Sequence, residues 1–383
     1  MQADEQKKRI LIYYGTYEIN TDSSKSIARL IASFIAEVEN NFAITFFTYQ
    51  SNYKDEIIKT SPVFIKSSVL LRAYRLVNNK FAFLKRIKES EIKLKSTESY
   101  LKKERKQFDI IIVIEPIHIS FIRKTFASSK IIYWIHGLSA LYNKSFAADI
   151  NLVDEVWSPT YIAHKRIVDA IHPIPFYPEF KLFPNWSEPV FANQNESSLT
   201  SLQTRHQIDK DTLIFIFAGG DKKLKGKYLL ERLIQKLSVC INRKIIFFFA
   251  GGQKKGEERL TKMIRVVELG VLTPKDLSCY FGIAHIGLFP SLGGYEHAPL
   301  TLLEMIDCGV IPIASNVGGV IEILGAGYPY LIETPNYVDE WVEKITELAT
   351  LPASKRQDVK NFLQDRRKLY KRIDALTLLE EVP

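Results

Sequence analysis

The chain has 383 residues, of which 46% are hydrophobic and 25% are charged, and its formal net charge is +9. These values are those of a globular protein too long for one compact core, so we expect two domains. No apolar run reaches the ~20 residues that span a bilayer, and the first residues, MQADEQKKRILIYY, lack the apolar segment of a signal peptide. The cysteines Cys240, Cys279 and Cys308 are far apart, which argues against a zinc site and favours free thiols in a reducing cytoplasm.

Short apolar runs rich in Ile, Val and Phe recur along the chain and alternate with helical patterns. In the N-terminal half the strand candidates are residues 9–15, 43–49, 109–115, 130–136 and 155–159. In the C-terminal half they are residues 213–220, 244–252, 285–291 and 310–315. Apolar strands without alternation, interleaved with helices, are typical of parallel sheets covered on both faces. We therefore predict an α/β protein with two parallel-sheet domains.

One segment of the N-terminal half is strongly basic. From Lys59 to Lys106 there are fourteen Lys and Arg residues against four Glu. Within it, residues 68–90 set Leu, Val, Phe and Ile at helical spacing between basic residues, a pattern typical of a helix on an anionic membrane surface. A packed helix with a solvated basic face explains the pattern equally well. No nucleic-acid-binding motif accompanies the charge, so we do not expect nucleic acid as a partner.

A polar stretch separates the two sets of strands. The predicted organisation is an N-terminal domain at 1–192, a linker at 193–207, a C-terminal domain at 208–352, and terminal helices at 353–383 that pack back toward the N-terminal domain. Open α/β sheets bind ligands outside the carboxyl ends of their strands, so candidate binding residues lie in the loops that follow the strands. None of these loops contains GxGxxG or GxxxxGK[ST], which argues against a dinucleotide site and a P-loop.

The loop after the strand candidate 213–220 has the composition of an anion site. Gly219 and Gly220 end the strand, and Lys222, Lys223 and Lys225 follow at the start of a helical pattern. Cations at this end of a helix oppose its dipole, and a bound anion would remove the conflict. Glycines allow close approach of the backbone, and helix N-termini attract phosphate. Three solvated lysines are the alternative interpretation.

Two carboxylates flank an apolar run in GGYEHAPLTLLE, residues 293–304. Pro299 suits the first position of a helix, which places Glu296 in the preceding loop and Glu304 inside the helix. The amides of Leu300 and Thr301 would then lie between the two carboxylates, where they are free to bind a diphosphate. The carboxylates could accept hydrogen bonds from sugar hydroxyls. A nucleotide sugar presents this set of groups.

Residues 287–324 resemble the donor-binding core of family 4 glycosyltransferases with the GT-B fold, the glycosyl transferases group 1. That core has the pattern PS…E-G-F-P-L…E-A…G-x-P-V-V-A-S…G-G…E. Further similarities follow in the same order: IHG at 135–137 resembles the histidine turn of the family, FPNWSEPVF at 183–191 its hinge, and 219–226 its phosphate loop. The C-terminal half matches densely and the N-terminal half sparsely. The resemblance implies two Rossmann-like domains that face each other across a cleft.

The resemblance also implies roles for particular residues. Glu304 would bind the ribose, Glu296 the hydroxyls of the donor sugar, and Lys225 the diphosphate, while His136 would touch the donor sugar from the N-terminal domain. Lys225, Glu296 and His136 are thus the catalytic candidates. The donor-binding candidates comprise Gly219, Gly220, Lys222, Lys223, Gly270, Val271, His297, Ala298, Pro299, Leu300, Thr301 and Glu304. The acceptor-side candidates are Gly15, Thr16, Ser23 and Ser24.

Three departures from the family pattern stand out. Gly220 occupies the place of the arginine that the family usually has in the phosphate loop, and Lys222 or Lys223 would substitute for it. His297 and Ala298 replace the usual Gly-Phe after the first glutamate, which changes the wall beside the sugar. The loop at 15–26 lacks the double glycine common there, although Ser23 or Ser24 could still cap the next helix.

The resemblance implies a retaining glycosyltransferase that needs no metal or other cofactor. It would transfer a hexose from a nucleotide-diphosphate sugar, with UDP favoured and GDP as the alternative, to a glycan, lipid-linked or protein acceptor. The expected setting is the synthesis of bacterial surface polysaccharide or glycoconjugate, in the cytoplasm or peripherally on the inner face of the plasma membrane through residues 59–106. The alternatives are an inactive glycosyltransferase-like binding subunit and a sugar-nucleotide epimerase with the GT-B fold.

Overall fold

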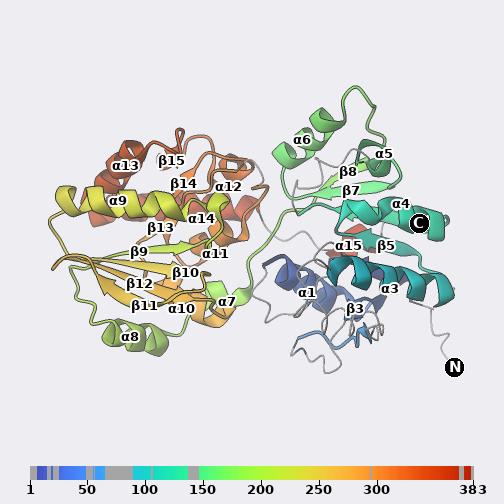
Figure 1. Cartoon of the computed structure of the whole chain (residues 1–383), viewed down its shortest axis with the longest axis horizontal. Coiled ribbons are helices and arrows are strands. Elements are labelled where there is room, and N and C mark those ends of the chain that lie inside the picture. The colour runs from blue at the N-terminus through green and yellow to red at the C-terminus, as the bar shows by residue number, and fades with distance from the viewer. Residues whose placement is uncertain are drawn as a thin grey trace, which may run out of the picture. The chain divides into compact units, whose positions relative to one another are not determined.

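The computed structural model describes residues 7–14, 19, 26–48, 55, 57–64, 89–104, 107–136, 146–293, 296–370 and 375–380. The chain divides into two compact units (Figure 1). The N-terminal unit comprises residues 1–158, 164–183 and 373–383, and the C-terminal unit comprises residues 159–163 and 184–372. Each unit is built around its own large sheet with helices, so the predicted α/β class is confirmed. No helix within the described ranges has both the length and the apolar character needed to cross a membrane.

The N-terminal unit contains a six-stranded parallel sheet. Its strand order is β2-β1-β5-β6-β7-β8, and every neighbouring pair runs parallel. The strands are β1 (Arg9–Tyr13), β2 (Ala43–Thr45), β5 (Ile110–Val113), β6 (Lys130–Trp134), β7 (Glu155–Ser158) and β8 (Glu179–Leu182). After β1 the chain goes first to β2 on one side and later to β5 on the other. The order therefore reverses between β1 and β5.

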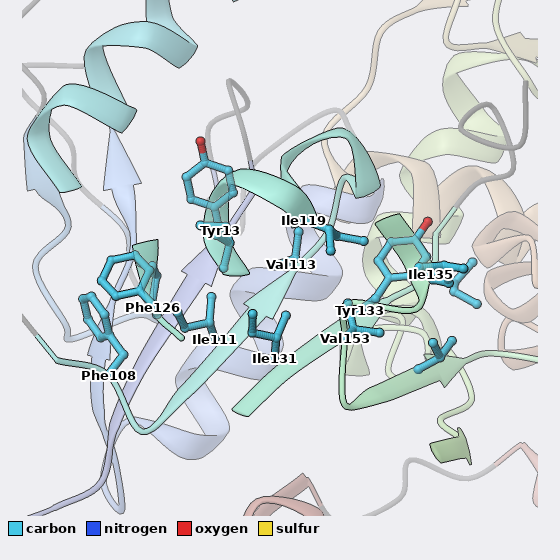
Figure 2. Packing of buried hydrophobic residues seen from close by; sticks show 14 of the residues in the cluster. Tyr13, Phe108, Ile111, Val113, Ile119, Phe126, Ile131, Tyr133, Ile135 and Val153 are labelled. Atoms are coloured by element: carbon cyan, nitrogen blue, oxygen red, sulfur yellow. The ribbon is translucent and has the colours of Figure 1, made fainter. Parts of the chain in front are cut away.

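Burial on both faces explains why the central strands are unbroken apolar runs. All four residues of β5 are buried, as are the last four of β1 and of β6. One face carries a hydrophobic cluster to which Ile111, Val113, Ile131 and Tyr133 belong (Figure 2). On β6, Trp134 follows Tyr133 and so points to the opposite face. There its ring centroid lies 5.2 Å from that of Phe34.

Helices cover this sheet and include two elements far apart in sequence. The helical elements are α1 (Ser26–Val38), α3 (Glu89–Glu104), the 3-10 turn η2 (Pro116–His118), α4 (Ile119–Thr125), α5 (Phe146–Ile150), α6 (Tyr161–Ile171) and α15 (Ala375–Glu380). α1 buries one apolar face, including Phe34. α15 packs on α1, where the Ala375 amide donates a hydrogen bond of 3.3 Å to Glu37 Oε1.

The predicted strand at 43–49 is divided in two. β2 ends at Thr45, and β3 (Phe47–Thr48) pairs in parallel with β4 (Val63–Phe64) in a separate two-stranded sheet. A single apolar run in the sequence thus serves two sheets. The pattern of apolar residues does not reveal the break because Phe46 and Phe47 are both buried.

The C-terminal unit contains a seven-stranded sheet in the order β11-β12-β10-β9-β13-β14-β15. The strands are β9 (Leu213–Ala218), β10 (Ile245–Ala250), β11 (Lys255–Arg259), β12 (Ile264–Gly270), β13 (Ile286–Phe289), β14 (Ile311–Ser315) and β15 (Leu331–Ile332). All pairs are parallel except β11 with β12. β9 is central, with β10 on one side and β13 on the other. The strand order therefore reverses between β9 and β13.

Helices lie on both faces of the C-terminal sheet. They are α7 (Pro189–Ala192), α8 (Glu196–Arg205), the 3-10 turn η4 (Lys223–Lys225), α9 (Lys227–Cys240), α10 (Pro274–Ile283), α11 (Leu300–Asp307), α12 (Val320–Leu324), α13 (Val338–Thr350) and α14 (Ala353–Leu369). α9 and α13 lie on one face, and α8 and α10 on the other (Figure 1). This cover agrees with the non-alternating apolar sequences of β9 and β10.

Two observed boundaries differ from the predicted ones. The predicted linker 193–207 contains α8, which packs on α10 inside the C-terminal unit, and the division between units falls at 183/184 instead. Only α15, of the predicted terminal helices 353–383, belongs to the N-terminal unit. α14 belongs to the C-terminal unit, where Arg367 forms an ion pair with Asp307 of α11. Polar composition marked residues 193–207 as a linker because α8 buries no side chain completely.

Most of the basic segment 59–106 lies outside the described residues. The structure describes residues 57–64 and 89–104, and the latter form α3. The predicted amphipathic helix at 68–90 therefore remains a prediction.

We predict that Glu155 stabilises the N-terminal unit through a buried ion pair. Its carboxylate, 1% exposed, lies 2.5 Å from Lys130 Nζ and 3.4 Å from Lys181 Nζ, on the two neighbouring strands. Trp157 Nε1 donates a 3.0 Å hydrogen bond to it. Glu155→Gln leaves two lysines without their shared counter-charge and should lower the free energy of unfolding by about 2 kcal/mol or more. Urea denaturation monitored by tryptophan fluorescence measures this change.

Glu179→Gln is the matched control, because Glu179 also lies near Lys181 but is 63% exposed. Its effect should stay below about 0.5 kcal/mol. Equal destabilisation by the two substitutions would contradict a special role for the buried pair.

Candidate functional site

A small pocket lies at the point where the strand order of the C-terminal sheet reverses. Open α/β sheets bind ligands at this place, outside the carboxyl ends of the strands. Its lining comes from the ends of β9 and β13, from the loops that follow them, and from the first turn of α11. The lining residues are Phe217, Ala218, Gly219, Lys225, Leu288, Phe289, Pro290, Ser291 and Thr301. Gly219, Lys225 and Thr301 were predicted from the sequence, whereas the remaining six were not.

The loops after β9 and β13 pack against each other through their backbones. Gly226 has φ +76°, and a Cβ atom there would lie 1.9 Å from the carbonyl oxygen of Pro290. The Leu292 amide donates a 2.8 Å hydrogen bond to the carbonyl oxygen of Leu224. Only glycine permits both this φ and this approach. Gly226 therefore holds the lysine-rich loop against the loop that leads to Glu296.

Lys225 and Glu296 meet in an ion pair beside this pocket. Lys225 Nζ lies 2.5 Å from Glu296 Oε1, and Ser291 Oγ donates a 2.8 Å hydrogen bond to the same oxygen. The ammonium also lies 5.8 Å from the ring centroid of Phe289. The Lys225 side chain is 33% exposed and that of Glu296 is 13% exposed, so the pair remains accessible. Two residues proposed independently from two motifs are thus in direct contact.

Three consecutive carbonyl groups hold the peptide that carries Glu296. The carbonyl oxygens of Glu296, His297 and Ala298 accept hydrogen bonds from the Gly319 amide at 2.7 Å, Thr160 Oγ1 at 3.3 Å and Asn185 Nδ2 at 2.8 Å. A Cβ atom on Gly319 would lie 1.6 Å from the His297 carbonyl oxygen. Sequence reasoning missed these three contacts. The two adjacent glycines after the strand candidate 310–315 were the one feature of the sequence that indicated such a close backbone contact.

The helix after this peptide begins one residue later than predicted. Pro299 is the N-cap of α11, and Leu300 is its first helical residue. Thr301 lines the pocket, so the N-terminal end of α11 points at it. An α-helix leaves its first amides without internal acceptors, which makes this end suitable for an anion. Glu304 lies inside the helix and is 3% exposed.

The other lysines that follow β9 do not line the pocket. Lys222 and Lys223 are exposed and do not line the pocket. Lys227, which the sequence did not single out, lies 2.8 Å from Asp221 and 2.9 Å from Glu268. Burial alone would lower the pKa of Lys227, but the bonds to these two carboxylates outweigh it and raise the pKa. Lys225 is therefore the lysine of this loop that reaches the pocket.

The strand ends beside the pocket carry further predicted residues. The Gly220 amide donates a 3.2 Å hydrogen bond to the Ala250 carbonyl, and the Gly251 amide donates one of 2.8 Å to the Gly270 carbonyl. These bonds bring the ends of β9, β10 and β12 side by side. Val271 follows and is 56% exposed, so it is accessible at this edge of the sheet.

Several predicted residues are buried or belong to the other unit. His297 and Ala298 are 3% and 5% exposed and do not line the pocket. His136 follows β6 in the N-terminal unit, where its ring centroid lies 4.5 Å from that of Trp134. The acceptor-side candidates lie outside the described residues; they are Gly15, Thr16, Ser23 and Ser24.

The C-terminal unit matches a known family of enzymes. Residues 200–366 match the family model of glycosyl transferases group 1. Over 166 residues the chain is 26% identical to the D-inositol 3-phosphate glycosyltransferase of Pseudarthrobacter chlorophenolicus. That match covers 41% of this chain and 39% of the length of the relative.

Solved structures match over almost the whole chain. HepE from Anabaena in complex with UDP-glucose has a TM-score of 0.64 at 12% identity, with 98% of each chain covered. A glycosyltransferase from Rickettsia africae has a TM-score of 0.65 at 15% identity, again with 98% of each chain covered. The trehalose-6-phosphate synthase OtsA has a TM-score of 0.70 at 12% identity and the same coverage. The fold is thus the two-sheet GT-B fold, and residues 200–366 match the glycosyl transferases group 1.

Proposed function

We propose that the protein is a retaining glycosyltransferase that transfers a hexose from a nucleotide-diphosphate sugar to an acceptor hydroxyl. The observation that supports it most is the Lys225–Glu296 ion pair beside the N-terminus of α11 at the strand reversal. A cation and helix amides suit a diphosphate, and a carboxylate suits sugar hydroxyls. One small site thus offers partners for both parts of a nucleotide sugar.

Donor binding would exchange the partners of the ion pair. The diphosphate takes the Lys225 ammonium and the first amides of α11, which releases the Glu296 carboxylate to accept hydrogen bonds from the sugar hydroxyls. Glu304 binds the ribose in this proposal, as its counterpart does in the family. The backbone bonds at Glu296, His297 and Ala298 keep the Glu296 peptide in place during the exchange. The site is therefore prepared before the donor arrives.

The chemical step breaks one bond at the anomeric carbon and forms another. The bond from this carbon to the β-phosphate oxygen breaks, and the acceptor oxygen attacks on the same face, so the configuration is retained. The acceptor proton passes to the leaving phosphate oxygen, which yields the nucleoside diphosphate and the new glycoside. Lys225 and the helix amides stabilise the charge that develops on the leaving group more in the transition state than in the ground state. The proposal requires no divalent cation.

UDP is the favoured nucleotide, since the Anabaena protein with this fold holds UDP-glucose and UDP. The proposed acceptor is a hydroxyl of a glycan, a lipid-linked sugar or a protein in the synthesis of bacterial surface polysaccharide or glycoconjugate.

Loss of either main donor contact should nearly abolish transfer. Lys225→Ala and Glu304→Gln should each raise the barrier by about 3 kcal/mol or more, which reduces the rate roughly 100-fold or more. UDP release from UDP-glucose in the presence of EDTA measures this rate. Lys236→Ala is the control, because Lys236 lies on α9 in an exposed pair with Asp339 and should leave the rate unchanged.

Near-wild-type rates in both variants would refute this site. Calorimetric binding of UDP by the wild type without any turnover would instead favour a binding subunit. Retention of configuration is read from the anomeric proton coupling of the product by NMR.

Gly226→Ala should weaken UDP binding without unfolding the protein. A methyl group 1.9 Å from the Pro290 carbonyl forces the loops after β9 and β13 apart and moves Lys225 away from the pocket. We expect UDP affinity, measured by calorimetry, to fall at least about tenfold, equivalent to 1.4 kcal/mol. Gly327→Ala is the matched control, since a Cβ atom there meets nothing within 4 Å. Equal affinities of the two variants would contradict the proposed role of the backbone contact.

The basic segment 59–106 should bind anionic membranes. Its excess of Lys and Arg predicts co-sedimentation with phosphatidylserine vesicles at low salt and release at high salt. Vesicles of phosphatidylcholine alone are the control. An absence of binding to the anionic vesicles at low salt would refute the peripheral membrane location.

A further inference from the structure

The N-terminal sheet has its own strand reversal, between β1 and β5, and the same rule places a ligand site at its carboxyl edge. Glu115 lies at this edge, two residues after β5. It is the N-cap of η2, and its side chain is 29% exposed. A partly exposed carboxylate therefore lies at the edge where open α/β sheets commonly bind a ligand.

A buried histidine supports this carboxylate. His118 Nε2 lies 3.3 Å from Glu115 Oε2, and the His118 amide donates a 3.3 Å hydrogen bond to the Glu115 carbonyl. The His118 side chain is 3% exposed, and its ring meets that of Tyr13 edge-on at 5.0 Å. The short turn Pro116–His118 brings the two residues together because they are three positions apart. His118 thus fixes the orientation of Glu115 from the protein side.

Two of the strands that end at this edge carry buried tyrosines. Tyr13 and Tyr133 belong to the same hydrophobic cluster, and Figure 2 shows both rings on the strands that end at this edge. Burial raises the pKa of Tyr133, and the negative charge of Glu115 raises it further, so this carboxylate lies close enough to influence the phenol.

No lysine or arginine in the part of the chain that the structure describes forms an ion pair with Glu115. Glu155, in the same sheet, differs from Glu115 because its carboxylate contacts two lysines. Asp149, the other carboxylate nearby, is 7% exposed and accepts a hydrogen bond from Ser120 Oγ. Among the described residues, Glu115 is thus a carboxylate at this edge that a ligand can reach.

We propose that Glu115, oriented by His118, binds the hydroxyl groups of the acceptor and selects an acceptor that is uncharged where it is bound. This inference rests on the proposed function and extends it to the N-terminal unit. A carboxylate accepts hydrogen bonds from sugar or polyol hydroxyls. A phosphate or carboxylate on the acceptor would be repelled by Glu115. The ligand class is therefore a neutral sugar or polyol headgroup, with Glu115 as a binding residue and His118 as a positioning residue.

Steady-state kinetics of substituted proteins separates this role from a structural one. The variants are Glu115→Gln, His118→Phe and His118→Gln, with Glu179→Gln as an exposed carboxylate control in the same sheet. The donor is UDP-glucose, and the acceptor probes are myo-inositol and n-octyl β-D-glucopyranoside. We expect Glu115→Gln to raise the acceptor KM at least tenfold while the hydrolysis of UDP-glucose by water and the affinity for UDP stay within twofold of wild type.

The histidine variants test the positioning role. His118→Phe keeps an aromatic ring against Tyr13 but removes the nitrogen, and it should raise the acceptor KM severalfold. His118→Gln returns a hydrogen-bond donor at a similar distance along the side chain and should restore part of the loss. Myo-inositol 1-phosphate should bind more weakly than myo-inositol to the wild type, and this difference should shrink in Glu115→Gln.

A wild-type acceptor KM in Glu115→Gln would overturn the inference, as would an equal loss of UDP affinity in that variant. Saturation-transfer NMR with the same probes in the presence of UDP keeps the test independent of turnover. If the wild type binds a probe but transfers nothing, the proposed function fails, whereas loss of the NMR signal in Glu115→Gln still supports the subsite. If neither probe binds the wild type, the subsite is refuted.

Discussion

The Lys225–Glu296 ion pair depends on a backbone contact that tolerates no side chain. Gly226 lies so close to the Pro290 carbonyl that the loops after β9 and β13 act as one layer. Lys225 precedes that glycine directly, while Ser291 follows the proline and bonds to Glu296. The position of both charges is thus set by main-chain packing at the reversal of the sheet. Lys225 and Glu296 are 71 residues apart in sequence, so without this contact between the loops their side chains would have no fixed positions relative to each other.

Strand position and local motif predicted where this pocket lies and three of its lining residues, Gly219, Lys225 and Thr301. The apolar runs of β9 and β13 are buried on both faces, so their ends, and the loops that follow, could be located from sequence. Lys225 and Glu296 each follow one of those ends by seven residues, and each was predicted from its own motif. Thr160 and Asn185 could not be found in this way. Their hydrogen bonds to the Glu296–Ala298 peptide join residues more than a hundred positions apart, and neither side chain belongs to an amphipathic pattern.

Two elements that sequence reasoning missed, β11 and α8, lack an apolar signature of their own. β11 has the sequence KGEER and is exposed along its length, and it is a strand only because β12 supplies hydrogen-bonding partners. α8 buries no residue completely, so its polar sequence resembles a linker although it packs on α10. Lys227, the first residue of α9, was not predicted because its partner Glu268 lies on β12. Local composition reveals burial, but it does not reveal which neighbour a polar element contacts.

Each unit is built from separate pieces of the chain, and this has a consequence for the order of folding. Residues 159–163 belong to the C-terminal unit, where Thr160 bonds to His297 and the Glu322 carboxylate accepts hydrogen bonds from the amides of Tyr161 and Ile162. The N-terminal unit in turn includes α15, which packs on α1 more than 300 residues earlier. During synthesis on the ribosome, domains usually fold in the order in which they emerge, but the N-terminal unit cannot be completed first. The N-terminal unit has to wait for residues 375–380, which appear only after the whole of the C-terminal unit has been made.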